Sequence, residues 1–407
     1  MKVAWVTPYL PEPAASGGAI RQQRLAAALA AHADVHLFAR GEPWERPRLA
    51  SPELALFASV WLGRDYWPSS RSTAPRRVRR GSPAALYRAV AALHREIGLD
   101  LVVVAHSWGA FGASELGLPW LLDEHNVESR YFEELNRSQQ RSGARATREL
   151  RELSRWERQA WTAATALTCV TEADAALMAE QRAHTGDPAL REPLVVPNGA
   201  DVSRTQPLHP HERRGGVLFV GSMHHRPNVN AALSLAEGIL PRVWSQLPDV
   251  SLTIVGGPVP SELLAARKRL GARSAAVVSL LGIVPDVQDC LAAARVFANP
   301  IRHGAGSSLK IAEALGAGTP IVSSDVGVRG FGLAPGRHYL SANTDEEQAH
   351  AIVRVLRDAE LAATLSREGR SIAERYAWPV LGSSFVAQVR RAAQKPSRYR
   401  DANLEKS

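Results

Sequence analysis

The stretch IRHGAGSSLKIAEALGAGTPIVSSD, residues 301–325, decides the fold of the second half of the chain. It follows a short apolar segment, 296–300, which predicts a strand. The glycine-rich residues after this strand predict a turn, then a helix that begins near Ser307 and a second strand that begins near Thr319. A strand, a tight turn, a helix and a further strand in this order indicate a parallel α/β sheet.

The glycine and charged residues of this stretch have the spacing of an anion site. Gly304 and Gly306 allow the backbone to come close to a ligand. The first N–H groups of the helix lack internal partners and carry the positive end of the helix dipole. Lys310 and Glu313 lie three residues apart and share a helix face, which suits a sugar nucleotide with phosphates at the turn and a ribose diol at Glu313. The alternative is an ordinary strand–turn–helix unit with its charges on a solvated face.

The rest of the chain alternates strands and helices in two series. The first half predicts strands at 2–7, 35–39, 101–105, 119–125 and 166–170, helices at 19–32, 84–97 and 144–163, and a glycine-rich loop at 8–18. Thr171 and Asp174 predict the start of a further helix, whereas residues 40–80 have an irregular pattern. The second half predicts strands at 216–222, 251–257, 276–280 and 296–300, and helices at 228–247, 260–270, 287–294 and 378–393.

Each series predicts a doubly wound parallel sheet, so the expected fold class is α/β with two Rossmann-like domains. We expect a first domain at 1–200 and a second at 201–376, with a helix at 377–395 that packs back on the first. Open parallel sheets bind ligands at the carboxyl ends of their strands. The two domains are therefore expected to face one another across a cleft that holds the active site.

Length and composition are those of an ordinary globular chain. The chain has 407 residues, of which 45% are hydrophobic and 22% charged, enough to bury two cores. It contains no apolar run long enough for a transmembrane helix, and its N-terminus predicts a strand rather than a signal peptide. Cys169 and Cys290 lie in apolar contexts and predict buried thiols in a reducing compartment. No Cys/His cluster has the spacing of metal ligands.

The net charge of +9 comes mostly from arginine and is densest at Arg76, Arg77, Arg79 and Arg80. Such a cluster can bind nucleic acid, but no aromatic-interleaved basic motif, zinc finger or recognition helix accompanies it. An anionic membrane surface, an anionic substrate and a simply solvated loop are the other interpretations.

Several motifs together resemble a known family. They are VVPNGAD (195–201), GSMHHRPNVNA (221–231), GIVPDV (282–287), the turn from Gly304 to Glu313, EALGAGTPIV (313–322), the Gly17–Gly18 loop and DEHNVES (123–129). With these motifs the chain resembles the GT-B-fold retaining glycosyltransferases of family 4, also called glycosyl transferases group 1. The resemblance covers nearly the whole chain and is strongest at 195–330.

The sequence departs from the family pattern in two places. The family often has two glutamates eight residues apart, and here Ala305 occupies the first position while Glu313 keeps the second. The usual Arg and Lys after the first strand of the nucleotide domain are replaced by Ser222 and the segment 225–227. Lys310, three residues before the glutamate, is found in a subset of the family.

The resemblance implies a role for each donor-side residue. Glu313 would bind the ribose hydroxyls, and Lys310 and Arg226 would neutralise the diphosphate leaving group. Ser307 and Ser308 would donate to a phosphate or cap the helix, and the nucleotide base would lie against the backbone at Val284. The turn of Gly304, Ala305 and Gly306 completes the donor site.

The resemblance also implies roles for the first domain. His125 would lie beside the transferred sugar, bind a hydroxyl and stabilise positive charge at the anomeric centre through its backbone, unless it is a structural histidine. Gly17 and Gly18 would approach the donor phosphates and the acceptor, or simply form a tight turn. Asp123 and Glu124 are further carboxylates for the acceptor hydroxyl.

The expected function is retaining transfer of a sugar from a nucleotide diphosphate sugar to an acceptor hydroxyl in glycan or glycoconjugate biosynthesis. A nucleotide-sugar epimerase, a glycosidic phosphorylase and a basic nucleic-acid-binding protein are the alternatives. No metal or other cofactor is expected. The expected partners are the donor and a glycan, lipid-linked or small-molecule acceptor, without nucleic acid. The expected location is the cytoplasm, including the inner face of the membrane.

Overall fold

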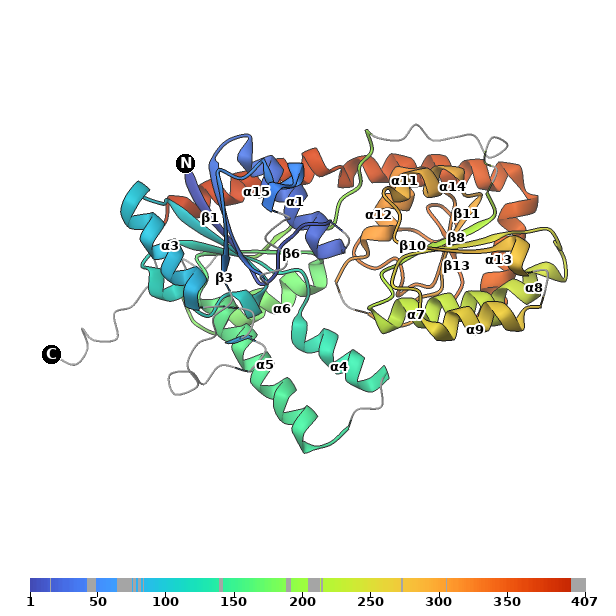
Figure 1. Cartoon of the computed structure of the whole chain (residues 1–407), viewed down its shortest axis with the longest axis horizontal. Coiled ribbons are helices and arrows are strands. Elements are labelled where there is room, and N and C mark those ends of the chain that lie inside the picture. Colours follow the sequence, from blue (N-terminus) through green and yellow to red (C-terminus); the bar gives the residue numbers. More distant parts are fainter. Residues whose placement is uncertain are drawn as a thin grey trace. The chain divides into compact units, whose positions relative to one another are not determined.

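The structure is a computed structural model that describes residues 1–14, 16–41, 49–63, 75, 78–79, 82, 84–138, 142–187, 192–203, 213, 215–271, 274–304 and 306–396. The chain divides into two compact units. The first comprises Met1–Pro197 and the chain from Pro379 onward, and the second comprises Asn198–Trp378. Both units are doubly wound parallel α/β sheets, which confirms the predicted fold class (Figure 1).

The described strands of the first unit form one seven-stranded parallel sheet in the order β3-β2-β1-β4-β5-β6-β7. The strands are β1 Lys2–Thr7, β2 Asp34–Arg40, β3 Ser59–Gly63, β4 Leu101–Ala105, β5 Trp120–Asp123, β6 Ala166–Cys169 and β7 Leu194–Val195. The longer helices are α1 Gly17–Ala30, α3 Ala84–Ile97, α4 Glu128–Ser138, α5 Ala144–Ala163, α6 Glu172–Ala183 and, from its second residue, α15 Trp378–Ala393.

Helices cover both faces of this sheet, which is why its central strands are almost purely apolar. Consecutive strand residues point to opposite faces. Val6 of β1 joins a core formed with α3, α5 and α6. Trp5 points the other way and meets Phe385 of α15, with ring centroids 5.8 Å apart. Every residue of β4, LVVVA, is consequently buried.

The described strands of the second unit form a six-stranded parallel sheet in the order β10-β9-β8-β11-β12-β13. The strands are β8 Val217–Val220, β9 Leu252–Val255, β10 Val278–Gly282, β11 Val296–Asn299, β12 Ile321–Ser323 and β13 Leu340–Ser341. The helices are α7 Arg226–Leu233, α8 Leu240–Trp244, α9 Ser261–Arg269, α10 Ser274–Val277, α11 Val287–Ala293, α12 Leu309–Gly316, α13 Asp345–Arg357 and α14 Ala359–Ala373.

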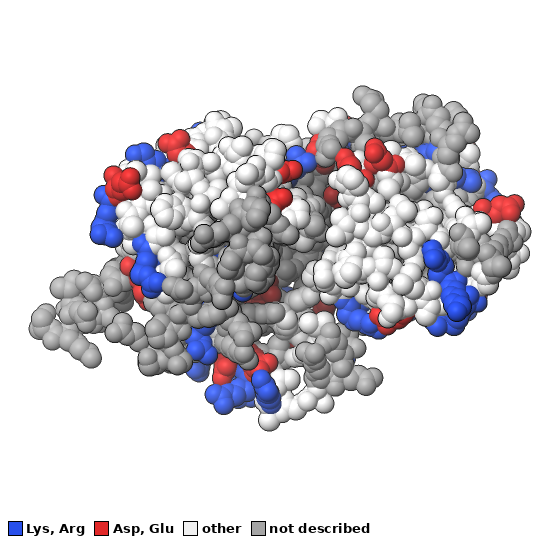
Figure 2. Space-filling view, viewed as in Figure 1, with Lys and Arg blue, Asp and Glu red and all other residues white. Residues whose placement is uncertain are grey.

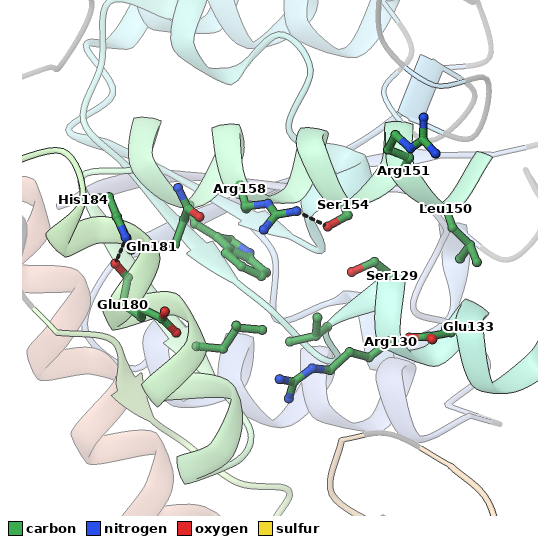
Figure 3. A pocket seen from close by; sticks show the side chains of 13 residues that line it. Ser129, Arg130, Glu133, Leu150, Arg151, Ser154, Arg158, Glu180, Gln181 and His184 are labelled. Carbon is green, nitrogen blue, oxygen red and sulfur yellow. Dashed lines mark hydrogen bonds between the residues drawn. The ribbon is translucent and has the colours of Figure 1, made fainter. Parts of the chain in front are cut away.

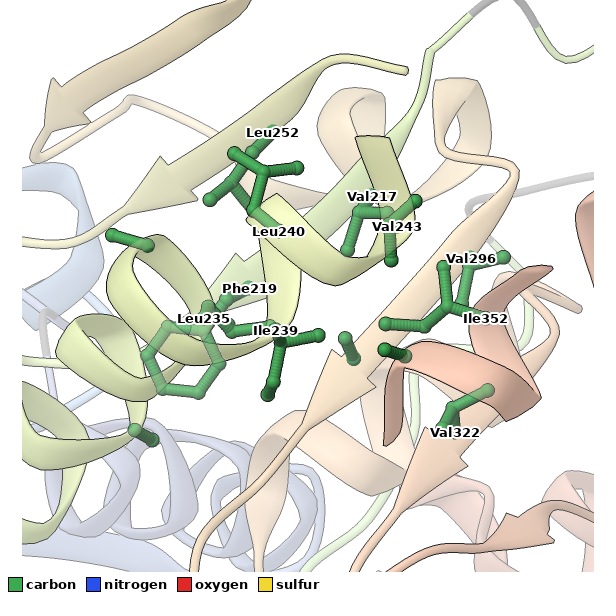
Figure 4. Packing of buried hydrophobic residues seen from close by; sticks show 14 of the residues in the cluster. Val217, Phe219, Leu235, Ile239, Leu240, Val243, Leu252, Val296, Val322 and Ile352 are labelled. Carbon is green, nitrogen blue, oxygen red and sulfur yellow. The ribbon is translucent and has the colours of Figure 1, made fainter. Parts of the chain in front are cut away.

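Two apolar cores lie on the two faces of the second sheet. One joins the sheet to α7, α8, α9 and α13, and Figure 4 shows Val217, Phe219 and Val296 of its strands packed against Leu235, Ile239 and other residues of the helices. The other joins the sheet to α11, α12 and α14. The second core holds α12 in place through its buried face, so the opposite face of α12 is left for polar contacts.

Most predicted elements are present, and the differences have local causes. Helix α1 begins inside the predicted glycine loop, because Ser16 Oγ accepts from the backbone N of Ala19 at 3.2 Å and caps the helix there. The predicted helix at 228–247 is interrupted by a π-helical segment, Ser234–Ile239. Pro241 follows this segment and lacks the N–H that a regular helix needs.

Other differences concern segments whose pattern is weak. The irregular region 40–80 contains β3, which pairs with β2 at the edge of the sheet. The strand predicted at 276–280 begins two residues later, at Val278, after the short helix α10. Helices α4, α13 and α14 were not predicted at all. Of the predicted basic cluster, Arg76, Arg77 and Arg80 lie outside the described residues, as does Ala305.

Charge on the described surface is mixed. On the face drawn in Figure 2, basic side chains are scattered among acidic ones. None of the described helices combines the length and hydropathy needed to span a bilayer.

Candidate functional site

In each unit the strand order reverses at one place. In the first unit this switch point lies between β1 and β4, and in the second it lies between β8 and β11. Ligands of open α/β sheets bind beside such points, at the carboxyl ends of the strands. Gly17 and Gly18 follow β1 and His125 follows β5, next to β4. Arg226 follows β8, and the 304–313 stretch follows β11. The other described candidates therefore lie at the carboxyl ends of strands near the switch points, where ligands bind. Val284 instead follows β10, which is not next to the switch point of its sheet.

Lys310 lies in the first turn of α12, where its ammonium group contacts two side chains of the β8 region. Its Nζ donates to Asn228 Oδ1 at 2.6 Å and lies 4.6 Å from the centre of the Phe219 ring. Asn228 donates through Nδ2 to the carbonyl oxygen of Ser222 at 2.8 Å. Burial, with a smaller contribution from the charge of Arg329, lowers the pKa of Lys310 to about 7. An anion beside Nζ would raise this pKa again, so the surroundings of Lys310 suit a negatively charged ligand.

The glycine-rich turn wraps around Arg329, a cation that the sequence analysis missed. Arg329 donates through Nε to Gly306 O at 2.9 Å and through Nη1 to Val326 O at 2.7 Å. Gly304 has φ 154° and Gly306 has φ 70°. Residues other than glycine rarely adopt the φ of Gly304, so this position favours glycine, and a Cβ there would also lie 2.6 Å from Arg329 Nη2 at the end of that side chain. Only the fold reveals Arg329, because it lies 23 residues beyond Gly306 in sequence.

Ser307 and Ser308 differ in their contacts. Ser307 Oγ accepts from the backbone N of Asn198 at 3.2 Å, and its carbonyl oxygen accepts from Asn198 Nδ2 at 3.0 Å. Ser307 thus connects the start of α12 to the beginning of the second unit. Ser308 is the N-cap residue of α12, and its hydroxyl makes no capping bond within the described chain. Donation to a phosphate stays a prediction for both serines.

The remaining donor-side candidates lie in different surroundings. Glu313 is half-buried in α12, three residues after Lys310. Val284 is half-buried and packs against the core of α11 and α12. Arg226 at the start of α7 pairs with Glu262 of α9 at 2.5 Å, with both side chains about two-fifths exposed (43% and 39%). An exposed pair of this kind contributes at most about 1 kcal/mol, so a phosphate can displace it.

In the first unit, His125 belongs to a buried hydrogen-bonded group centred on Asp123. Arg21 of α1 donates through Nε and Nη2 to the two carboxylate oxygens of Asp123, at 3.0 and 2.7 Å. Thr168 Oγ1 donates to Asp123 Oδ1 at 2.7 Å, and His125 Nε2 lies 3.0 Å from Oδ2. Burial opposes ionisation of Asp123, but Arg21 and His125 outweigh it and hold the pKa of this carboxyl well below its usual range. Asp123 is thus an ionised anchor and has no oxygen left for an acceptor hydroxyl.

The ionised Asp123 fixes the tautomer of His125. A carboxylate accepts only, so the proton of the imidazole is on Nε2 and Nδ1 carries the lone pair. Nδ1 is buried, and no described residue bonds to it. Burial, followed by the effect of His106, lowers the pKa of His125 to about 3, so the ring is neutral at pH 7. The first unit therefore offers a hydrogen-bond acceptor next to Gly18, whose Cβ, if present, would lie 3.3 Å from Nδ1.

His106, which sequence reasoning missed, packs against the ring of His125 and helps to hold it in place. Its ring centroid lies 3.9 Å from that of His125, and its Nε2 lies 3.1 Å from Tyr9 Oη. Its Nδ1 lies 3.4 Å from Glu128 Oε1. Its φ of 65° is the one positive value of a non-glycine residue in the described chain. Backbone strain of this kind concentrates at functional sites, and it leaves no signal in the sequence.

The buried carboxyl groups of Glu124 and Glu157 hold the loops that follow β4 and β5. Glu124 accepts from the backbone N and Oγ of Ser107, both at 2.9 Å. Glu157 of α5 accepts from the backbone N of Glu128 at 2.5 Å and of Ser129 at 3.0 Å, and so caps α4. Burial raises the pKa of Glu124 well above its usual range and that of Glu157 to about 8. Glu124 is therefore a structural residue, not a carboxylate that contacts the acceptor.

Gly18 is expected to tolerate no side chain while Tyr9 keeps its hydroxyl. A Cβ at Gly18 would lie 2.3 Å from Tyr9 Oη but 3.6 Å from Cζ. We expect Gly18→Ala to lower the free energy of unfolding by about 1–3 kcal/mol, the usual cost of overpacking. In a Tyr9→Phe background the same change should cost much less, because the clashing atom is absent. Urea unfolding of the four proteins measures this coupling, and equal costs in both backgrounds would contradict it.

Comparison with known proteins agrees with this architecture. Residues 15–204 match the family described as Glycosyltransferase Family 4, and residues 214–358 match the family described as Glycosyl transferases group 1. The chain is 30% identical over 202 residues to a phosphatidyl-myo-inositol mannosyltransferase of Mycolicibacterium smegmatis, which covers 47% of this chain and 50% of that protein. The chain thus spans about half the length of the curated relatives it matches.

Solved structures show the same fold over nearly the whole chain. Sucrose-phosphate synthase of Thermosynechococcus elongatus superimposes with a TM-score of 0.71 at 18% identity, covering 96% of this chain and 98% of that one. HepE of Anabaena in complex with UDP-glucose superimposes with a TM-score of 0.67 at 16% identity, covering 96% and 100%. The chain therefore belongs to the GT-B-fold glycosyltransferases of the family 4 type.

Proposed function

We propose that this protein transfers a sugar, with retention of anomeric configuration, from a nucleotide diphosphate sugar to a hydroxyl of a growing glycan or glycoconjugate. The observation that carries the proposal is the partly buried ammonium group of Lys310 at the carboxyl edge of the second sheet, with its pKa lowered to about 7. A desolvated cation at this edge stabilises the negative charge that develops on a diphosphate leaving group. The named activity of the mannosyltransferase relatives and the UDP-glucose bound to HepE support the donor class.

The second unit binds the donor in this proposal. Lys310 and Arg329 neutralise the diphosphate, with Arg226 as a further cation once it leaves Glu262. The backbone of Gly304 and Gly306 and the N-terminus of α12 supply N–H donors. Glu313 accepts two hydrogen bonds from the ribose diol. With these cations present we propose that transfer needs no metal ion.

The first unit supplies His125 as a hydrogen-bond acceptor. Its lone pair on Nδ1 accepts from a hydroxyl, and Asp123 and His106 hold the ring in place. An imidazole whose pKa is about 3 is a weak base at pH 7. His125 thus orients a hydroxyl without removing its proton, which fits a retaining reaction in which the leaving phosphate takes that proton.

Because both cysteines, Cys169 and Cys290, are free thiols, we propose a cytoplasmic location.

The test is a screen of nucleotide diphosphate sugars by thermal shift, followed by assay of nucleotide diphosphate release with and without acceptors. A donor that raises Tm in a concentration-dependent way identifies the nucleotide and sugar. Release that requires an acceptor supports transfer, and release without one points to another reaction. Epimerisation would convert the donor without any release. Repeating the assay in EDTA tests the metal-free proposal, which complete loss of activity restored by Mg²⁺ or Mn²⁺ would overturn.

His125→Ala is expected to reduce turnover on the order of 100-fold, the effect of a poorly oriented reacting group, while the affinity for nucleotide diphosphate changes little. The reason is that His125 belongs to the first unit, whereas the proposed phosphate and ribose contacts all belong to the second. The exposed His32→Ala in the same unit is the matched control. Normal transfer by the His125 variant would remove His125 from the proposed site.

Donor affinity is expected to weaken as the pH rises above about 7. The free protein loses the Lys310 proton near this pH, whereas a bound diphosphate raises the pKa of Lys310 and requires the proton. The dissociation constant should therefore increase by up to about tenfold per pH unit between pH 7 and 9. Lys310→Arg keeps its charge over this range and should give a flat profile. Calorimetry of both proteins checks this, and a flat profile for the unmodified protein would contradict it.

A further inference from the structure

Helices α4, α5 and α6 of the first unit enclose a hollow of about 740 Å³ that none of the proposed donor or acceptor contacts uses (Figure 3). Pockets that hold small molecules have volumes of roughly 300–1,000 Å³, so the hollow has the size of a ligand site. It opens at the surface of the unit, beside the start of α4.

The hollow combines an apolar floor with a charged rim. Val127 and Trp161 are buried in it and Leu177 is half-buried. Arg130 of α4 and Arg158 of α5 are exposed, and Figure 3 shows their side chains on opposite sides of the space between these helices. A site of this composition suits a ligand with one anionic end and one apolar end.

The two rim arginines lack a carboxylate partner among the described residues, as does Arg151 of α5, which also lines the pocket. Three other arginines of α4 and α5 each pair with a glutamate four residues away: Arg137 with Glu133, Arg145 with Glu149 and Arg148 with Glu152. Arg158 instead donates to the neutral hydroxyl of Ser154 at 2.9 Å. Among the described residues, neither Arg158 nor Arg130 forms an ion pair.

The acidic residues of the pocket do not cancel this charge. Glu133 lines the pocket but accepts from Arg137 at 3.3 Å. Glu180 lines it from α6 and is exposed. The three arginines that line the pocket without an ion pair, Arg130, Arg151 and Arg158, therefore outnumber the one carboxylate that has no cation among the described residues.

Trp161 belongs to the apolar floor of the pocket and carries a buried donor without an acceptor. Trp161 is only 2% exposed, and its indole Nε1 makes no hydrogen bond within the described chain. Leaving a buried N–H unpaired costs about 1–3 kcal/mol, so an acceptor is normally supplied. Trp161 lines this pocket, but its Nε1 has almost no accessible surface, so a ligand in the pocket contacts the ring and reaches this N–H only if the side chain shifts.

We propose that this pocket binds a phosphate ester carried on an apolar group. The phosphate oxygens accept from Arg130 and Arg158, and the apolar group covers Val127 and Leu177. Arginine forms charge-assisted hydrogen bonds with phosphate, and the apolar floor selects an ester over the free ion. Binding here requires neither the donor nor sugar transfer. This proposal can therefore be tested, and contradicted, independently of the proposed function.

The experiment is calorimetric titration of the full chain with octyl phosphate, with inorganic phosphate and octyl glucoside as probes that each lack one half of the ligand. We expect one saturable site for octyl phosphate and binding at least tenfold weaker for both other probes. Arg130→Gln/Arg158→Gln should weaken octyl phosphate binding at least tenfold. The matched control, Arg137→Gln/Arg145→Gln, removes two arginines of the same helices outside the pocket and should leave binding unchanged.

Flotation with phosphatidylcholine vesicles that contain phosphatidate distinguishes the source of the ester. Vesicle binding lost with Arg130 and Arg158 identifies a lipid headgroup as the ligand. Octyl phosphate binding that depends on these arginines, without vesicle binding, identifies a soluble phosphate ester. Equal binding by the pocket variant and the control variant, or no binding of octyl phosphate at all, overturns the proposal. Circular dichroism confirms that each variant is folded.

Discussion

Replacement of Lys310 by methionine is expected to lower the turnover of sugar transfer by roughly 10²–10³-fold, the usual effect of removing one group that stabilises transition-state charge. Methionine keeps an unbranched apolar side chain and removes the charge, with its contact to the Phe219 ring, and the hydrogen bond to Asn228. Negative charge on the diphosphate grows as the glycosidic bond breaks, so the interaction is stronger in the transition state than in the bound donor. Turnover should therefore fall more than donor affinity.

Lys268→Met is the control for this experiment. Lys268 is exposed on α9 in the same unit, so its removal lowers the net charge equally without touching the proposed site. Steady-state kinetics of both variants separates the effects on turnover and on the Michaelis constant. If the Lys310 variant shows a raised Michaelis constant with unchanged turnover, Lys310 contributes to ground-state binding alone.

The fold was largely predictable because the pattern of apolar residues along the chain clearly indicates most strands and helices. A parallel sheet covered on both faces needs continuous apolar strands, and LVVVA at 101–105 and VFAN at 296–299 meet that need. The start of α12 was predictable because a glycine turn precedes an apolar helix face. Helix α4 was missed because its pattern is strongly polar, and it depends on the capping by Glu157 from a later helix.

Without the family resemblance, which named His125 and Arg226, the candidate site was predictable only where its residues are close in sequence. Lys310 and Glu313 lie on one turn of helix, so their spacing alone brings them together. Arg329 and His106 reach their places through the fold and through a positive φ, which no spacing reveals. Arg21 did carry a signal: it precedes the buried Leu25 by four residues and so lies on the apolar face of α1.

The largest effect on stability is expected from Asp123→Asn, which should lower the free energy of unfolding by about 3–5 kcal/mol. The change leaves the buried guanidinium of Arg21 facing an uncharged amide, with Val196 O and Pro197 O as its remaining partners. It also replaces two carboxylate oxygens, which accept hydrogen bonds from Arg21, Thr168 and His125, with one amide oxygen and an NH₂ group that cannot accept. An unmatched buried charge accounts for most of the cost.

Urea unfolding at pH 7 measures this effect, with Glu149→Gln as the contrasting control. Glu149 pairs with Arg145 on the surface, at 67% and 86% exposure, so its loss should cost less than about 1 kcal/mol. Because the folded-state pKa of Asp123 is depressed, its stabilisation is fully present above the usual carboxyl pKa of about 3.9 and is lost as the pH falls through the folded value. The difference in the free energy of unfolding between the unmodified protein and Asp123→Asn should therefore be constant from pH 5 to 8 and shrink in strong acid.

In a double-mutant cycle, Arg21→Met should recover part of the cost of Asp123→Asn, since it removes the buried charge that has lost its partner. Costs that simply add would show that Arg21 and Asp123 contribute to stability independently, which would contradict the role of this ion pair.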